Sequence, residues 1–466
     1  MQQGEFGSLW ERVRAAGSLS ERFLSSADTA VTLDRLLGAS SLDAELQELR
    51  GRSVLLLVTD QLQAALALIE LDGIARRIVL CPPDVADEHI PAVILQAEVD
   101  AIVSDWEDAK LRNLSSVRLI ACGTELRSGD PDRTKTVSTE WILFTSGTVG
   151  QPKLVVHTLF SLTGAIRNST GPAASPVWST LYDIRRYGGL QILLRSLLQG
   201  SSLVLSSGKE PLEDFLARAG QHHISNISGT PSHWRRVLIS TSTGSISPQY
   251  IRLSGEIADQ AVLDQLRAFY PNARIVHAFA STEAGVAFEV HDGLSGFPAQ
   301  FVGQQDAEVE MRVQEGSLRI RSARTASRYL GTQMPSLRDS EGFVDTSDLV
   351  ELRDDRYYFV GRKDGVINVG GLKVHPEEVE AVINRHHKVQ ISAVKSRFNA
   401  ITGGIVVADV VLKPGSSAGA DVANDAGLRS ELIKHCRIFL PPHKVPASIR
   451  FVPSLQLTTS GKLARS

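Results

Sequence analysis

Cysteine is scarce in this sequence, and long hydrophobic runs are missing. The 466 residues contain three cysteines at positions 81, 122 and 436, too few and too scattered for a disulfide framework or a metal cluster. No apolar stretch approaches the roughly 20 residues of a membrane-spanning helix, and the N-terminus lacks the basic-then-apolar pattern of a secretion signal. These absences predict a cytoplasmic protein without a membrane partner.

An excess of charge of one sign is also lacking. The chain has 49 Lys and Arg against 52 Asp and Glu, a net charge of −3, which gives no reason to expect a nucleic-acid partner. Its 42% hydrophobic and 22% charged residues are typical of a globular protein. The length allows two or more domains, and the oligomeric state stays open.

Short apolar segments alternate with amphipathic ones over most of the chain. Strands are expected at residues 53–59, 77–81, 101–104, 117–122, 201–206, 224–228, 251–253 and 274–278, and helices at 61–75, 91–98, 213–221 and 258–269. This alternation predicts parallel β units. Short β segments follow at 307–313, 317–320, 349–352 and 357–360, and then a helix at 376–385, strands at 391–395 and 405–412, and a helix at 427–439.

The pattern as a whole predicts an α/β protein of two domains. Residues 1–360 would form a large N-terminal domain of mixed sheets flanked by helices, with a small β-barrel-like part. Residues 361–466 would form a small α+β C-terminal domain, whose first helix has proline at its first position followed by two glutamates.

One stretch, Leu143–Lys153 (LFTSGTVGQPK), has the composition of a phosphate-binding loop. Glycines let the backbone approach a polyanion closely, while hydroxyls, backbone N–H groups and a lysine donate to phosphate oxygens. The spacing differs from the GxxxxGK[ST] nucleoside-triphosphate loop, and a surface loop is the plainer alternative. The apolar spacing of residues 155–166 favours a helix directly after it.

Four later motifs follow this loop in a fixed order. They are Phe279–Gly285 (FASTEAG), Gly342–Leu349 (GFVDTSDL), Gly361–Glu380 (GRKDGVINVGGLKVHPEEVE) and Leu457–Arg465 (LTTSGKLAR). With the TSGT-x-G-x-PK loop, this order resembles the adenylate-forming superfamily of acyl-CoA synthetases, carrier-charging adenylation domains and firefly luciferase. The resemblance covers the chain from about residue 50 to its end, and it implies that the C-terminal domain is mobile.

The resemblance implies a role for each matching residue. Those expected to bind the nucleotide are Thr145, Ser146, Gly147, Thr148, Gly150, Lys153, Phe279, Ala280, Ser281, Asp348 and Arg362. Thr282 would contact the α-phosphate and Glu283 would hold Mg²⁺, since a carboxylate at a strand's end suits that ion. Lys462 would bridge the attacking carboxylate and the α-phosphate as negative charge develops.

The same resemblance assigns the parts of the chain that move and receive the thiol. Asp364 would be the hinge, and Gly370 and Gly371 would line the path of the pantetheine arm. Three departures stand out: Phe279-Ala280 replaces the usual Tyr-Gly, Ser347 replaces a glycine, and Arg186 aligns with a histidine.

The acid pocket is expected from three segments, residues 182–190 (YDIRRYGGL), 254–256 and 278–287. The candidate pocket residues are Tyr182, Arg186, Tyr187, Gly189, Ser254, Gly255 and Glu256. Arg185 and Arg186 could favour an acid with a second anionic group. The alternative is that both arginines point to solvent.

The resemblance therefore implies an enzyme that uses ATP and Mg²⁺ to convert a small-molecule carboxylic acid to acyl-AMP and pyrophosphate. Transfer of the acyl group to coenzyme A would follow. Two alternatives are transfer to the phosphopantetheine of an acyl carrier protein, and a non-catalytic nucleotide-binding homologue. The pairs His222-His223 and His386-His387 read as solvated residues without a metal-site partner, and Cys436 as part of a helix packing face.

Overall fold

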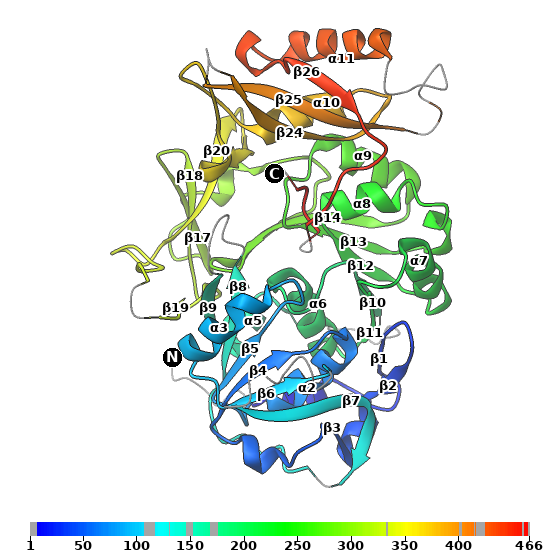
Figure 1. Cartoon of the computed structure of the whole chain (residues 1–466), viewed down its shortest axis with the longest axis vertical. Helices are drawn as coiled ribbons and strands as arrows, with labels where there is room; N and C mark the ends of the chain where they lie inside the picture. The colour runs from blue at the N-terminus through cyan, green and yellow to red at the C-terminus, as the bar shows by residue number, and fades with distance from the viewer. Residues whose placement is uncertain are drawn as a thin grey trace.

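Two large mixed sheets, a smaller antiparallel sheet and a C-terminal α/β unit make up the molecule (Figure 1). The computed structural model describes residues 7–106, 117–129, 131–145, 152–167, 176–331, 334–399, 403–413, 415, 425–458 and 461–464. The expected α/β architecture is confirmed in this part of the chain.

The first sheet has eight strands in the order β19-β9-β8-β5-β4-β6-β7-β3. They are β3 (Ala39–Leu42), β4 (Ser53–Leu57), β5 (Arg77–Leu80), β6 (Ala101–Ser104), β7 (Arg118–Ser128), β8 (Glu140–Thr145), β9 (Lys153–Thr158) and β19 (Arg328–Tyr329). The strands from β8 to β7 run parallel, whereas β9, β19 and β3 pair antiparallel. Strands β4, β5 and β6 are buried along their whole length, because both faces of a parallel sheet are covered.

The second sheet also has eight strands, in the order β15-β14-β13-β12-β10-β11-β1-β2. They are β1 (Phe23–Ser25), β2 (Ala30–Thr32), β10 (Val177–Thr180), β11 (Ser202–Leu205), β12 (Asn226–Gly229), β13 (Tyr250–Ser254), β14 (Arg274–Ser281) and β15 (Gly285–Val290). Only the edge strands β15 and β2 are antiparallel to their neighbours. The other six strands are parallel, and five of them follow one another from β10 to β14 in the chain. Because they are parallel, their carboxyl ends lie along one edge of the sheet.

Helices of both sheets share one hydrophobic core. These helices are α1 (Leu9–Ala15), α2 (Gln61–Leu71) and α6 (Tyr187–Leu198), and their apolar side chains pack with those of strands from both sheets. Helices α3 (Ile90–Gln96), α5 (Leu159–Thr163), α7 (Leu212–Gln221), α8 (Pro231–Val237) and α9 (Gln260–Phe269) complete this part. The shared core fixes the two sheets relative to each other.

An antiparallel sheet of five strands follows, in the order β16-β21-β20-β18-β17. Its strands are β16 (Phe297–Pro298), β17 (Val309–Gln314), β18 (Ser317–Ser322), β20 (Val344–Arg353) and β21 (Arg356–Arg362). Strand β20 contains most of the GFVDTSDL motif, and β21 leads into the GRKDG motif at the boundary with the C-terminal unit.

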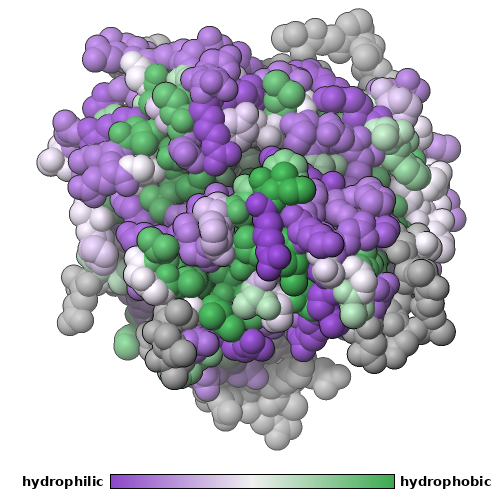
Figure 2. Space-filling model, turned by 90° about the horizontal axis from the view of Figure 1, so that it is seen from above, coloured by the Kyte–Doolittle hydropathy of each residue, from purple (hydrophilic) through white to green (hydrophobic). Residues whose placement is uncertain are grey.

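The C-terminal unit has a core of its own. It contains the hairpin β22 (Ile367–Val369) and β23 (Leu372–Val374), the sheet of β24 (Val389–Asn399), β25 (Gly403–Leu412) and β26 (Ser448–Phe451), and the helices α10 (Pro376–Asn384) and α11 (Ala426–Phe439). Figure 2 looks onto this end of the molecule and shows hydrophobic areas between hydrophilic side chains. After β26 the last residues run back down to the second sheet, beside α8 (Figure 1).

Two parts of the secondary structure differ from expectation. Residues 153–158 form strand β9 instead of the start of a helix, and only the short helix α5 follows them. Four consecutive buried residues in β9 produce the same apolar run as a buried helix, so the periodicity did not discriminate between the two. Helix α6 occupies part of a segment for which we had expected only pocket residues.

Candidate active site

The proposed phosphate loop joins the antiparallel strands β8 and β9. Thr145, the last residue of β8, pairs with Lys153, the first residue of β9. Ser146, Gly147, Thr148 and Gly150 lie outside the described residues. The Lys153 ammonium lies 5.7 Å from the centre of the Tyr329 ring, a distance at which a cation and an aromatic face attract.

Tyr329 in turn connects this lysine to the motif that contains Glu283. Its hydroxyl shares a hydrogen bond with the Glu283 side chain, and burial together with this carboxylate raises the pKa of Tyr329 to about 12. Tyr329 therefore stays a neutral donor. The backbone carbonyl of Glu283 also accepts from the N–H of Ala326 at 2.9 Å. Tyr329 was not among the residues predicted from the sequence.

A second residue that sequence reasoning missed holds Thr282 in place. His157 of β9 is fully buried, and its Nε2 lies 2.6 Å from the carbonyl oxygen of Thr282. Burial lowers the pKa of His157 to about 4, so the ring is neutral. Nε2 then donates to Thr282, and Nδ1 lies 2.9 Å from the Ser161 hydroxyl. The sequence signal that could have identified His157 is its position as a polar residue directly after an apolar run.

The two residues at the start of this motif lie on β14, beside the antiparallel sheet. The Phe279 ring stacks with Phe288 and Phe359 at centroid distances of 5.7 and 5.1 Å. Ala280 is half-buried next to it, and the Ser281 hydroxyl accepts from the N–H of Ala284 at 3.0 Å. Phe279 thus packs in an aromatic cluster, and its expected contact with adenine stays a prediction.

Asp348 occupies the bend of β20 that faces the C-terminal unit. Its carboxylate lies 3.4 Å from the Arg362 guanidinium, and its N–H donates to the Thr346 hydroxyl at 3.1 Å. Burial raises the pKa of Asp348, against the opposing effect of Arg362 and Lys462. Ser347 beside it has φ of 60°, a left-handed conformation that explains why a glycine suits this position.

Lys462 reaches this same region from the end of the chain. Its Cε lies 3.8 Å from the place that a Cβ on Gly255 would occupy. Lys462 is exposed as a whole residue, but its ammonium group is buried, and this burial lowers the pKa of Lys462. The carboxylates of Glu256, Asp348 and Glu283 oppose this effect, and Arg362 adds to it. The structure thus brings together residues from four distant motifs.

The residues assigned to the hinge and the pantetheine path lie on two turns at the start of the C-terminal unit. Asp364 is exposed in a short 3-10 turn, Lys363–Gly365, between β21 and β22. Gly370 and Gly371 form the turn of the β22–β23 hairpin with φ of 58° and 85°. Positive φ at both central residues is the geometry of a type I′ turn, which already accounts for both glycines.

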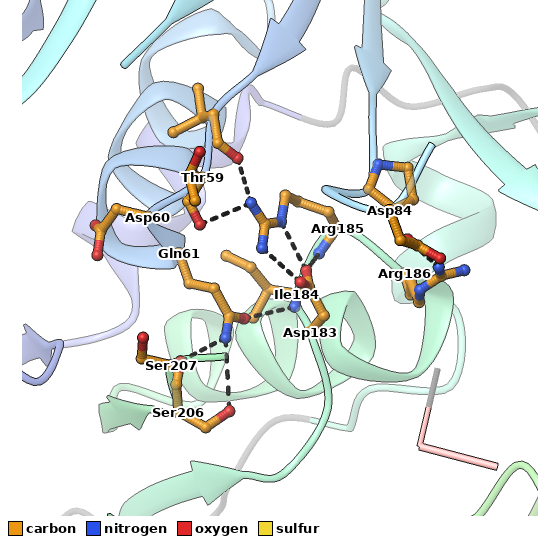
Figure 3. Close-up of polar contacts among 12 residues, drawn as sticks. Thr59, Asp60, Gln61, Asp84, Asp183, Ile184, Arg185, Arg186, Ser206 and Ser207 are labelled. Carbon is orange, nitrogen blue, oxygen red and sulfur yellow. Dashed lines mark hydrogen bonds and ion pairs between the residues drawn. The ribbon is translucent and has the colours of Figure 1, made fainter. Parts of the chain in front are cut away.

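Both arginines of the pocket segment are paired with aspartates (Figure 3). Arg185 is 3% exposed, pairs with Asp183 at 2.5 Å and donates to the carbonyl of Thr59 at 2.9 Å. Arg186 forms an ion pair with Asp84. The alternative that both arginines point to solvent is therefore wrong. The guanidinium of Arg185 is engaged by the Asp183 carboxylate and a backbone carbonyl.

The remaining pocket candidates pack around the end of β13. The buried Tyr182 hydroxyl donates to the backbone carbonyl of Ser254 at 2.7 Å, and burial raises the pKa of Tyr182 to about 12. Tyr187 is buried as well, at the start of α6. Gly189 lets α6 approach the preceding turn, since a Cβ there would lie 2.2 Å from the carbonyl oxygen of Asp183.

Two further arginines near this pocket were not predicted. Arg252 is 2% exposed, and both it and Arg195 share the carboxylate of Glu289, at 3.1 and 3.3 Å. One guanidinium nitrogen of Arg252 lies 3.3 Å from the Ser254 hydroxyl, while its Nη2 has no hydrogen-bond partner among the described residues. An unpaired buried donor of this kind is a candidate contact for a polar ligand.

The expectation for His386 was wrong. Its side chain is 6% exposed and lies 3.2 Å from Glu431, and with His387 these residues form a group whose ligand atoms lie within 4.8 Å of one another. Lys388 also pairs with Glu431, at 2.9 Å, so the carboxylate is neutralised by protein groups. Cys436 is buried in the core of the C-terminal unit, as expected.

The fold is that of an α/β protein with a large part built on two mixed sheets and a smaller C-terminal unit, and charged residues from four separate motifs meet at their junction. A family model described as "AMP-binding enzyme" matches residues 31–330, and one described as "AMP-binding enzyme C-terminal domain" matches residues 378–462. The chain therefore belongs to the AMP-binding enzyme family, within the adenylate-forming superfamily, and it is an enzyme of the acid–thiol ligase type.

Several relatives share this sequence pattern over most of their length. A 2-succinylbenzoate–CoA ligase of Listeria innocua is 26% identical over 387 residues, which are 80% of this chain and 77% of the relative. A benzoate–CoA ligase of Thauera aromatica is 26% identical over 374 residues, 75% of this chain and 69% of the relative.

A solved structure shows the same fold. The benzoate CoA ligase of Burkholderia xenovorans aligns with a TM-score of 0.80 at 18% identity, covering 98% of both chains. Among the described residues, no helix combines the length and apolar character that crossing a membrane requires.

Proposed function

We propose that this enzyme joins an aromatic carboxylic acid to coenzyme A in two steps. In the first, a carboxylate oxygen attacks the α-phosphorus of ATP, the bond from that phosphorus to the oxygen bridging to the β-phosphate breaks, and acyl-AMP and pyrophosphate form. In the second, the thiol sulfur attacks the acyl carbon, the thiol loses its proton, and AMP leaves. The names of the relatives support coenzyme A as the acceptor and an aromatic acid as the substrate. They give no support to a carrier protein.

The position of Lys462 is the observation that carries this proposal. Its ammonium interacts with the charges of Asp348, Glu283 and Arg362, although each of these residues lies a hundred positions or more away in the sequence. A cation held there stabilises negative charge on the α-phosphate as the carboxylate attacks. At the same junction Asp348 would bind the ribose diol, because a carboxylate can accept from both hydroxyls through its two oxygens.

Magnesium is proposed to bind at Glu283. A single protein carboxylate completed by phosphate oxygens and water is a typical Mg²⁺ site, and the hydrogen bond with Tyr329 orients this carboxylate. The ion would neutralise phosphate charge. Thr282, whose carbonyl contacts His157, would donate its hydroxyl to the same phosphates.

The pocket supports an acid with a second polar or anionic group. Arg252 contacts Ser254, which also binds Tyr182, so its unpaired Nη2 lies among the expected pocket residues. This arginine, and not Arg185, would recognise the second group. A panel that pairs simple benzoates with aromatic dicarboxylates in acid-dependent ATP–pyrophosphate exchange tests this choice.

Replacing the lysine tests the proposed function itself. We expect Lys462→Ala to reduce acid-dependent ATP–pyrophosphate exchange by about a hundredfold or more. Thioester formation from chemically prepared acyl-AMP and coenzyme A should stay close to wild type, because that step does not need the cation. Lys434→Ala, which removes an exposed lysine of α11, is the matched control. Unchanged exchange in Lys462→Ala would contradict the assignment.

A further inference from the structure

The segment that contains Lys462 is held by side chains of the N-terminal part. The two carboxylate oxygens of Glu256 each accept one backbone N–H: Oε1 accepts from Leu463 and Oε2 from Ser232, both at 2.9 Å. Ser232 lies in the first turn of α8, where N–H groups have no partner within the helix. One side chain therefore ties the end of the chain to the start of α8.

The residue before the lysine is held just as closely. The Thr230 hydroxyl, at the N-cap of α8, donates to the carbonyl of Gly461 at 2.6 Å. Gly461 has φ of 74°, and a Cβ on it would lie 2.0 Å from Cε1 of the half-buried His233 ring. His233 packs edge-on against Tyr182 at 5.7 Å and has little room to move. Gly461 and Leu463 are thus fixed on either side of Lys462.

The residue that packs beside the Lys462 side chain, Gly255, directly precedes Glu256. Gly255 approaches the Lys462 side chain without a side chain of its own, and its φ is 86°. Movement of Glu256 would therefore change both the backbone contact next to Lys462 and the position of Gly255, which packs against its side chain.

We propose that Glu256 is a positioning residue for adenylate formation: its carboxylate, by binding the N–H groups of Ser232 and Leu463 together, latches Lys462 into the nucleotide site and is released before thioester formation. This role rests on the proposed function and differs from that of a pocket residue, since both oxygens are engaged by the backbone.

Glutamine is the informative replacement for Glu256. Its size is the same, but its amide has only one oxygen, and its NH₂ group would face the second backbone N–H as donor against donor. Glu256→Gln must therefore give up one of the two bonds. Thr230→Val is a second variant that keeps the shape and removes the bond to Gly461, together with the cap bond that the hydroxyl accepts from the His233 N–H. Glu351→Gln, at an exposed residue that pairs with Arg353, is the matched control.

Hydrogen–deuterium exchange tests the latch without any substrate. We expect the terminal peptide that includes Leu463 to exchange about tenfold faster or more in Glu256→Gln than in Glu351→Gln, as expected for the loss of a hydrogen bond to a charged acceptor. Equal exchange in the two variants would overturn the latch, whatever the enzyme's activity.

The two half-reactions then separate a positioning role from a loss of structure. Acid-dependent ATP–pyrophosphate exchange should fall about tenfold or more in Glu256→Gln and Thr230→Val, while thioester formation from prepared acyl-AMP stays within twofold of the control or rises. An equal fall in both half-reactions, or unchanged exchange, would overturn the proposal. A wild-type enzyme that shows no exchange with any acid would instead refute the proposed function, and the deuterium result would still decide on the latch.

Discussion

At one position where this enzyme departs from the family pattern, the backbone conformation explains why the pattern has a glycine. Ser347 stands where related sequences have a glycine, and its φ of 60° is left-handed. Its N–H donates to Asp345 at 2.9 Å, and Asp345 also pairs with Lys363. These contacts hold the bend that presents Asp348, and Ser347 adopts a strained conformation within it.

Ser347→Gly should therefore stabilise the protein. A left-handed conformation costs a residue with a side chain about 1 kcal/mol or more, and glycine avoids that cost. We expect a higher melting temperature by calorimetry, without loss of ATP–pyrophosphate exchange. Ser340→Gly, an exposed position without positive φ, should give no increase. A lower melting temperature for Ser347→Gly would show that the serine side chain compensates for its backbone strain.

Individual elements were predicted with uneven success, and the reason is local in each case. The strands and helices around 53–104 were found because short buried strands and an apolar helix differ in length. Strand β9 was missed because Leu154, Val155 and Val156 are all buried, and a short run of buried residues has the same pattern in a helix and in a strand. The expected phosphate loop kept its position between these two elements.

The packing of helix α6 on the turn before it can be tested by mutation. Gly189 lets α6 pack on the turn at Asp183, where a Cβ would lie 2.2 Å from the carbonyl oxygen. Gly189→Ala should lower the free energy of unfolding by about 1–3 kcal/mol, since overpacking forces the backbone to shift. Gly208→Ala, where a Cβ would meet nothing within 4 Å, should leave the melting temperature unchanged. Equal melting temperatures for the two variants would mean that α6 can move away from the turn.

At the scale of the whole molecule, a second polar contact supports the arrangement that places Lys462. Arg235 of α8 donates to the carbonyl of Gln390 in β24 at 3.2 Å, and the Gln390 amide donates back to the Arg235 carbonyl at 3.2 Å. Arg235 also pairs with Asp259 at 2.5 Å. Helix α8 therefore contacts both the terminal segment and the body of the C-terminal unit.

Breaking this contact should favour other arrangements of the two units. We expect Arg235→Met to reduce ATP–pyrophosphate exchange about tenfold or more, with little effect on thioester formation, and to change the small-angle scattering curve toward a less compact particle. Arg236→Met, at the exposed neighbouring position, is the control. Identical scattering and exchange for both variants would show that α8 does not hold the units together.

The sequence by itself determined the family, the α/β alternation and the order of the motifs, because a phosphate loop, a paired carboxylate and a terminal lysine need particular residues at particular places in the chain. The division at residue 360 and the individual site roles stay predictions. Only the tertiary structure decided which side chains face each other. In the structure His157 contacts Thr282 and Tyr329 contacts Glu283. Arg185 pairs with Asp183, and Glu256 accepts from the N–H of Leu463. Two of these four contacts, His157 with Thr282 and Glu256 with Leu463, join residues more than a hundred positions apart, and no local pattern encodes contacts of that kind.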